Sequence, residues 1–190
     1  MDFFKINDVN ISSWDGGSTE EFFIYPVGSN YAKRDFSIRV SRANVDKVDG
    51  NFTHLPDYKR FLIPISKDLM LEINGGRMLI KKETTFSFDG SEKIISKTTG
   101  SDFNLMLKKD MVGKMEVLKF KDKLIIRDDI KQNKILFFYN LRDNIKLSSA
   151  NKEMELCHNE FGVAIARDKY EMVINPSTSD NCIIWGKVSL

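Results

Sequence analysis

Histidine and cysteine are scarce in this chain of 190 residues, which contains two of each. A transition metal in a small β-barrel usually needs two or three imidazoles and a carboxylate, placed at alternating positions so that the side chains face inward. His54 and His158 lie far apart in the chain, neither belongs to a His-x-His pair, and no Cys-x-x-Cys motif occurs. The sequence therefore predicts neither a metal site nor a bound cofactor.

The chain also lacks the close pairs of reactive side chains on which many catalytic sites depend. Cys157 and His158 are adjacent, but neighbouring residues of a strand point to opposite faces, so this nucleophile and base would not meet. The same geometry separates the carboxylates of Glu20 and Glu21, which excludes them as an acid–base pair. No glycine-rich loop with the spacing of a phosphate-binding motif is present.

Long apolar runs and an excess of charge of either sign are missing as well. The longest apolar runs span about six residues, as at Phe161–Ala166, whereas a membrane-spanning helix needs roughly 20. The 29 Lys and Arg residues and the 27 Asp and Glu residues leave a net charge of +2, so neither nucleic acid nor a membrane is an expected partner. The first residues, from Met1 to Lys5, do not resemble a secretion signal, and we therefore expect a cytoplasmic protein with reduced cysteines.

What the sequence does contain is a repeated two-residue hydrophobic period. Apolar residues recur at every second position in many short stretches, such as Phe36, Ile38 and Val40, and clusters of Gly, Asn, Asp and Ser separate the stretches. Asn74–Gly76 supplies residues that tolerate the positive φ of a hairpin turn. Helical periodicity is limited to one short turn or helix expected over residues 128–134. This pattern predicts an all-β sandwich or barrel.

No linker rich in glycine or proline interrupts the chain, so residues 1–190 are expected to form a single domain. The best seam lies at Asp110-Met111-Val112-Gly113, because the stretches before and after it have a similar strand rhythm. We therefore expect two β sub-units, approximately residues 1–110 and 111–190.

Several polar residues lie in stretches that are otherwise apolar. Along residues 35–45, strand alternation places Arg39 and Ser41 on one face and the large apolar residues on the other. If the apolar face is the core, Arg39 is a solvated surface residue. If the strand belongs to a barrel whose outer face is covered, Arg39 and Ser41 line a cavity. Arg60 and Asp102-Phe103-Asn104 allow the same two interpretations.

Short sequence strings occur in a fixed order between about residues 12 and 107. The strings are Trp14-x-Gly16-Gly17-x-Thr19-x-Glu21, Tyr25-Pro26, Phe36-x-x-Arg39-x-Ser41-x-Ala43, Phe52-Thr53-x-Leu55-Pro56-x-x-x-Arg60, Phe88-x-Gly90 and Asp102-Phe103-Asn104-Leu105-Met106. In this order and spacing they resemble the HutD/Ves family, and the last of them is the most specific.

The resemblance implies a cupin-type fold, a double-stranded β-helix, with two β-barrel units in one chain (a bicupin). It also implies that the histidine ligands of metal-binding cupins have been lost. Members of the family are associated with histidine-utilisation operons, where a regulatory role is expected, and with bacterial stress responses. No established reaction accompanies the family.

The first functional hypothesis is a binding module in which Arg39 and Arg60, from neighbouring strands, hold a small carboxylate in a barrel mouth. A buried guanidinium needs an anion, either from the protein or from a ligand. A spare guanidinium edge would select a planar carboxylate. The remaining candidate residues are Asp102 and Glu21 as internal partners of the arginines, Thr19, Ser41 and Asn104 for neutral hydrogen bonds, and Trp14 as an apolar wall.

Two alternatives remain open. A metal-free enzyme on the same scaffold would use Glu21 or Asp102 for proton transfer and an arginine to stabilise developing negative charge. In the other alternative, these residues brace the barrel and the function lies in contacts with other proteins. A homodimer formed through an edge strand is compatible with each of these, although no residue identifies that surface.

Overall fold

The computed structural model describes residues 1–129 and 132–190, and its regular structure is almost entirely β-strand. Besides strands β1 to β19 it contains one turn of 3₁₀ helix, η1 (Tyr31–Lys33). The described residues form no α-helix, which confirms the all-β prediction. Over the same residues, no helix has the length and apolar character needed to cross a membrane.

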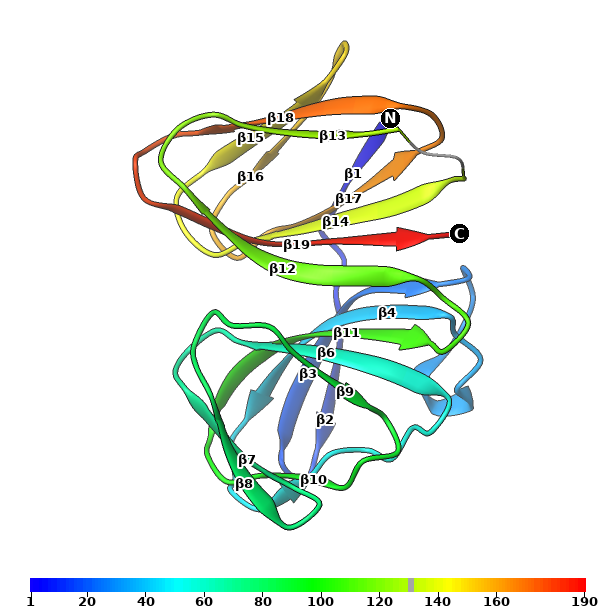
Figure 1. Ribbon diagram of the computed structural model, residues 1–190, viewed down its shortest axis with the longest axis vertical. Coiled ribbons are helices and arrows are strands. Elements are labelled where there is room, and N and C mark those ends of the chain that lie inside the picture. The colour runs from blue at the N-terminus through cyan, green and yellow to red at the C-terminus, as the bar shows by residue number, and fades with distance from the viewer. Residues whose placement is uncertain (130–131) are drawn as a thin grey trace. The chain divides into compact units, whose positions relative to one another are not determined.

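The chain divides into two compact units. One unit is residues 8–111, and the other consists of residues 1–7 together with residues 112–190 (Figure 1). The strand rhythm of the sequence predicts that residues 1–7 belong to the first sub-unit. The structure places them with the second half because β1 (Asp2–Ile6) pairs antiparallel with β17 (Phe161–Ala166) along its whole length.

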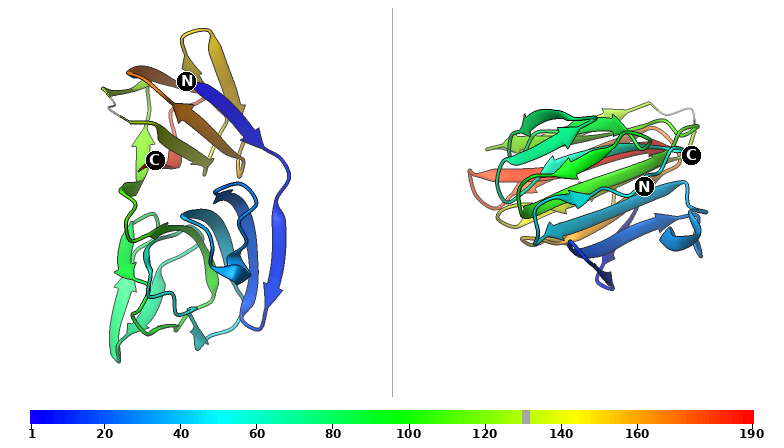
Figure 2. Two further views of the ribbon diagram at one scale, coloured as in Figure 1. Left: turned by 90° about the vertical axis from the view of Figure 1, so that its right-hand side faces the viewer. Right: turned by 90° about the horizontal axis from the view of Figure 1, so that it is seen from below.

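The unit of residues 8–111 consists of two antiparallel sheets. One has six strands in the order β2-β3-β4-β11-β6-β9, and the other has four in the order β5-β10-β7-β8. In the left view of Figure 2, β7 and β8 lie on the opposite side of this unit from β2 and β3. The bounds are β2 (Asn10–Trp14), β3 (Gly17–Tyr25), β4 (Ile38–Val45), β5 (Gly50–Asn51), β6 (Tyr58–Pro64), β7 (Leu69–Ile73), β8 (Gly76–Ile80), β9 (Phe86–Asp89), β10 (Ile94–Ser96) and β11 (Gly100–Lys108).

The register of the six-stranded sheet gathers polar residues on one face. Arg39 of β4 pairs with Met106 of β11, which pairs on its other side with Arg60 of β6. Two residues further along β4 and β11, on the same face of the sheet, Ser41 pairs with Asn104. Because alternate residues of a strand face the same side, these five side chains share a face. The opposite face of β4 and β11 carries apolar residues that are buried over most of its length. Both faces of these strands are therefore covered.

Apolar side chains from both sheets form one core cluster of this unit. Leu62 of the six-stranded sheet packs with Leu71 and Ile80 of β7 and β8 and with Ile94 of β10. A smaller cluster contains Met106. The first cluster holds the two sheets together, whereas the polar face that carries Arg39, Ser41, Asn104 and Arg60 (the polar row) is only partly covered by apolar side chains.

The unit of residues 1–7 and 112–190 also contains two antiparallel sheets. Their strand orders are β1-β17-β14-β19-β12 and β13-β18-β15-β16. The bounds are β12 (Gly113–Phe120), β13 (Leu124–Asp128), β14 (Lys134–Asn140), β15 (Ile145–Ser149), β16 (Lys152–Leu156), β18 (Tyr170–Pro176) and β19 (Asn181–Ser189). The helical turn expected within residues 128–134 falls between β13 and β14, and residues 130 and 131 lie outside the described residues.

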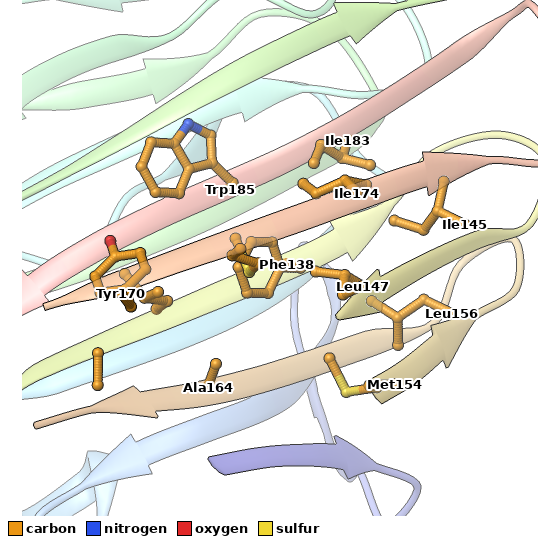
Figure 3. Close-up of a cluster of buried hydrophobic side chains, with 13 residues drawn as sticks. Phe138, Ile145, Leu147, Met154, Leu156, Ala164, Tyr170, Ile174, Ile183 and Trp185 are labelled. Atoms are coloured by element: carbon orange, nitrogen blue, oxygen red, sulfur yellow. The ribbon is translucent and has the colours of Figure 1, made fainter. Parts of the chain in front are cut away.

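Large apolar side chains fill the interior of this second unit (Figure 3). Phe138 and Trp185 come from the five-stranded sheet, and Leu147, Leu156 and Ile174 come from the four-stranded sheet. All of them are buried. The interior of this unit is therefore filled by large apolar side chains, whereas in residues 8–111 the inward face of β4, β11 and β6 carries arginine, serine and asparagine.

Gly90 provides a test of the packing around the polar row. Its N–H donates to the carbonyl of Tyr58, its carbonyl accepts from Leu55, and an added Cβ would lie 2.0 Å from the Leu55 carbonyl oxygen. We expect Gly90→Ala to lower the free energy of unfolding by roughly 1–3 kcal/mol, because two backbone segments would have to move apart. The measurement is denaturant unfolding. Gly76→Ala is the control, because a Cβ there meets its nearest atom at 3.5 Å, and equal effects of the two substitutions would contradict the packing described.

A candidate carboxylate-binding cavity

A cavity of about 300 Å³ lies within the unit of residues 8–111. Its floor is the polar face of β4, β11 and β6, and residues of β2, β3, η1 and the segment around Phe52 form its walls. The lining includes two arginines, Arg39 and Arg60, and one carboxylic acid, Asp102. Arg39 and Arg60 lie on either side of β11, so their backbones are about 10 Å apart, the width of two strand spacings.

Arg39 is paired within the protein. Its side chain is 4% exposed, and its Nε donates to Oε2 of Glu21 at 2.5 Å, which forms a salt bridge. Nη1 donates to the hydroxyl of Ser41 at 3.3 Å, and the guanidinium carbon lies 4.1 Å from the centre of the Tyr31 ring. A carboxylate, a hydroxyl and an aromatic face therefore stabilise the Arg39 charge.

Arg60 is buried to a similar degree, with 6% of its surface exposed, but it has weaker partners. Nη1 donates to the backbone carbonyl of Thr53 at 3.1 Å, and the guanidinium carbon lies 5.3 Å and 4.9 Å from the ring centres of Phe52 and Phe88. Its Nε has no hydrogen-bond partner, and no carboxylate among the described residues forms an ion pair with it. Burial lowers the pKa of Arg60 to about 10, and the positive charge of Arg39 acts in the same direction.

Asp102 is the acid of the cavity floor, and 3% of its surface is exposed. The side-chain amide of Asn104 donates a hydrogen bond to its Oδ1. No lysine or arginine of the described residues forms an ion pair with it. Burial raises the pKa of Asp102 to about 6, and the hydrogen bond from Asn104 and the charge of Arg60 offset part of this increase.

Trp14 lines the cavity from β2, which is an edge strand, and it is 41% exposed. Its indole N–H donates to the hydroxyl of Thr19 at 3.1 Å. A Cβ added to Gly16 would lie 1.9 Å from the Trp14 ring, so the glycine allows the ring to lie against the backbone. The indole is therefore held in place with part of its surface open.

The comparison with protein families gives one match that covers most of the chain. The HutD family model matches residues 6–179. This chain belongs to the HutD family. The family predicted from the sequence strings is thus confirmed, and the match extends well past residue 107, where those strings end. None of the curated protein sequences matches the chain.

Solved structures show that this HutD-family chain has a cupin-like fold. A conserved protein of unknown function from Pseudomonas aeruginosa PAO1 has a TM-score of 0.87 at 17% identity, with 100% of both chains covered. HutD from Pseudomonas fluorescens SBW25, solved in a formate condition, has a TM-score of 0.77 at 17% identity, and the match covers 97% of this chain and 98% of that one. A cupin 2 conserved barrel domain protein from Leptotrichia buccalis has a TM-score of 0.59 at 9% identity, with 96% and 97% covered.

The structure brings the sequence-predicted residues of this HutD-family protein together. All of them except Glu21 line the cavity, and Glu21 contacts it through the salt bridge to Arg39. Two details differ from expectation. Arg39 and Arg60 lie on strands separated by β11, because β11 is inserted between β4 and β6 in the sheet. Asp102 forms an ion pair with neither arginine and instead accepts from Asn104.

Sequence reasoning missed the aromatic and apolar part of the cavity. Tyr31, Phe52 and Met106 line it, and Thr53 contributes a backbone carbonyl to Arg60. Phe52, Thr53 and Met106 all lie in the strings that resembled the family, so a signal for them was present. Tyr31 lies outside those strings, in a connection whose 3₁₀ turn shows no apolar period. Among the described residues, no three His, Cys, Asp or Glu side chains gather closely enough to hold a metal ion.

The raised pKa of Asp102 predicts that this residue destabilises the folded protein at neutral pH. The unfolded chain gives up this proton near the ordinary value of 3.8, whereas the folded protein keeps it until about pH 6. Between these values the folded state binds more protons, so its stability falls as the pH rises. We expect Asp102→Asn to raise the free energy of unfolding by about 1–3 kcal/mol above about pH 6.

Denaturant unfolding at several pH values measures this effect. The gain from Asp102→Asn should shrink as the pH falls from about 6 towards about 4, where the wild-type carboxyl becomes protonated in both states. A gain that does not change with pH, or a loss of stability above pH 6, would show that burial of the Asp102 carboxylate does not destabilise the folded protein.

Proposed function

We propose that this HutD-family protein binds a small carboxylate in the cavity of residues 8–111, without a metal, and that binding serves a regulatory role. The role would belong to histidine utilisation or to a stress response, as the family resemblance suggests. We also propose that the protein works in the cytoplasm, that it does not act on nucleic acid or membranes, and that its protein partner is a second copy of the chain in a homodimer.

The observation that carries this proposal is the incomplete set of partners around Arg60. A guanidinium removed from water loses several kcal/mol of solvation unless an anion and hydrogen-bond acceptors replace the water. Arg39 has such an anion in Glu21, whereas Arg60 has one backbone carbonyl and two aromatic rings. A ligand carboxylate at Arg60 would supply the missing negative charge and could accept two parallel hydrogen bonds.

The rest of the cavity suits a small organic anion. Its volume of about 300 Å³ is at the lower end of the range typical of small-molecule sites. Ser41 and Asn104 offer neutral hydrogen bonds, and Trp14 and Phe52 offer apolar surface. An oxalate decarboxylase of similar fold from Lactobacillus farciminis was solved as a formate complex, which is consistent with a carboxylate ligand in this cavity.

A metal-free enzyme is the second candidate, and the raised pKa of Asp102 is the observation that favours it. A carboxyl group that titrates near pH 6 can exchange a proton with a substrate at neutral pH. This candidate requires turnover of a carboxylate without added metal and loss of that turnover in Asp102→Asn. We favour binding, because the hydrogen bond that Asp102 accepts comes from the neutral amide of Asn104, and none of the described residues adds a titratable partner to complete an acid–base pair.

We further propose that each unit corresponds to one cupin barrel, so that the whole chain forms a single bicupin domain. The division of the chain into two units, each built of two antiparallel sheets, supports this assignment. The likeness to a cupin 2 conserved barrel domain protein supports it as well.

Arg60→Ala tests the proposed site. Wild-type protein should be stabilised by at least one of formate, glutamate, formylated glutamate and urocanate, by about 2.7 kcal/mol when the ligand is present at 100 times its Kd. We expect Arg60→Ala to remove this stabilisation and to leave the circular dichroism spectrum unchanged. Thermal unfolding with and without each compound is the measurement. Arg77→Ala, which removes an exposed arginine of β8, is the matched control. Stabilisation that survives Arg60→Ala would refute the site.

The number of ligands per chain tests the difference between the two units. Calorimetric titration with the compound that stabilises most should give one site per chain, because apolar side chains fill the interior of residues 1–7 and 112–190. Two equivalent sites per chain would contradict this assignment.

A further inference from the structure

The charges that face the cavity do not balance once a ligand is bound. Glu21 of β3 neutralises Arg39 of β4, which leaves the positive charge of Arg60 on β6 and the carboxyl group of Asp102 on β11. Without a ligand, an ionised Asp102 is the anion of the cavity floor that the charge of Arg60 stabilises from a distance. A ligand carboxylate would be a second anion for the same cation.

Two carboxylates in one buried cavity repel each other strongly. Asp102 is 3% exposed, so little water screens its charge from a ligand in the cavity. Within the described part of the chain it has no ion pair, and its hydrogen bond from the neutral amide of Asn104 is available to the carboxyl in either protonation state. When two carboxyl groups lie close together in one site, the pKa of one of them is raised, which favours uptake of a proton.

We infer that Asp102 takes up a proton when the cavity binds a carboxylate, and that the site therefore accepts one singly charged carboxylate group at Arg60. This inference rests on the proposed function and makes Asp102 the residue that sets the charge of the ligand. The protonated carboxyl group can donate a hydrogen bond to the ligand, which an ionised one cannot. Asp102 thus selects for a monoanion and couples its binding to pH.

The other ionisable groups around Asp102 do not provide the same coupling. Arg39 and Arg60 remain charged near neutral pH, and Glu21 is held by the salt bridge to Arg39. Tyr31 of η1 also lines the cavity, and its ring lies against Arg39. His54 is the histidine of this unit, next to Thr53, and its side chain is exposed. Because histidine titrates in the same pH range, it needs a control of its own.

The experiment measures the Kd of formate, as a function of pH, for the full-length protein and two variants. Formate stays ionised throughout, because carboxylic acids titrate about two units below the lowest pH used, about pH 6. For the wild type, the Kd should rise by up to about tenfold for each pH unit above the pKa of Asp102, and so by about tenfold or more between pH 6 and pH 8. Calorimetry in buffers of different ionisation enthalpy should show uptake of a fraction of a proton, approaching one at pH 8.

The variants assign this dependence to a residue. Asp102→Asn keeps the shape of the side chain and its acceptor for the Asn104 amide, and we expect a Kd for formate that is independent of pH, with no proton uptake. His54→Gln should behave as the wild type does. The inference is overturned if wild-type Kd is constant over this range, if Asp102→Asn retains the pH dependence, or if His54→Gln removes it.

The inference and the proposed function fail in different ways. Formate binding that depends on Arg60 but not on pH would leave the proposed function standing and remove the role of Asp102. Absence of formate binding at every pH, together with absence of stabilisation by the other carboxylates, would remove both.

Discussion

A buried guanidinium group with too few partners is the constraint from which the account of this protein follows. The strands that carry Arg39 and Arg60 are covered on both faces, and only 4% of Arg39 and 6% of Arg60 is exposed, so both guanidinium groups have lost most of their contact with water. Glu21 resolves this problem for Arg39. For Arg60 the protein supplies a carbonyl, two ring faces and the distant charge of Asp102, and the burial of Asp102 in turn raises its own pKa. Arg60 and Asp102, the two charged groups that are buried without an ion-pair partner among the described residues, line the same cavity.

The two units show what this arrangement requires. Each consists of a pair of antiparallel sheets, and in each the central strands of the larger sheet point alternate side chains inward. Where β14 and β19 carry Phe138 and Trp185, the interior is filled. Where β4, β11 and β6 carry Arg39, Asn104 and Arg60, a cavity remains. The same pair of antiparallel sheets can therefore enclose either a filled apolar interior or a cavity. The residues at alternate positions of the central strands determine which of the two forms. This accords with the general finding that folds do not determine functions.

A period of two in the sequence predicted the strand class and the shared face of Arg39 and Ser41, and the strings that resemble the HutD family added further cavity residues such as Trp14 and Thr19. Alternation placed Arg39 beside Ser41 but left the buried and the solvated interpretations open, and the structure shows that Arg39 is buried. Three features could not be read in this way. The order of β4, β11 and β6 is set by pairing between distant segments, so the sequence could not show that a strand separates the two arginines. The bulge between Glu21 and Phe23 shifts the register of β3 by one residue, which simple alternation does not foresee. The pairing of β1 with β17 joins the two ends of the chain.

A high-resolution crystal structure of the protein grown with formate would show whether Arg60 holds the anion. We expect a planar ligand in the cavity of residues 8–111, with its oxygens accepting hydrogen bonds from the guanidinium of Arg60. A structure in which Arg60 forms a direct ion pair with Asp102, or in which water alone occupies the cavity, would show that Arg60 does not bind a carboxylate.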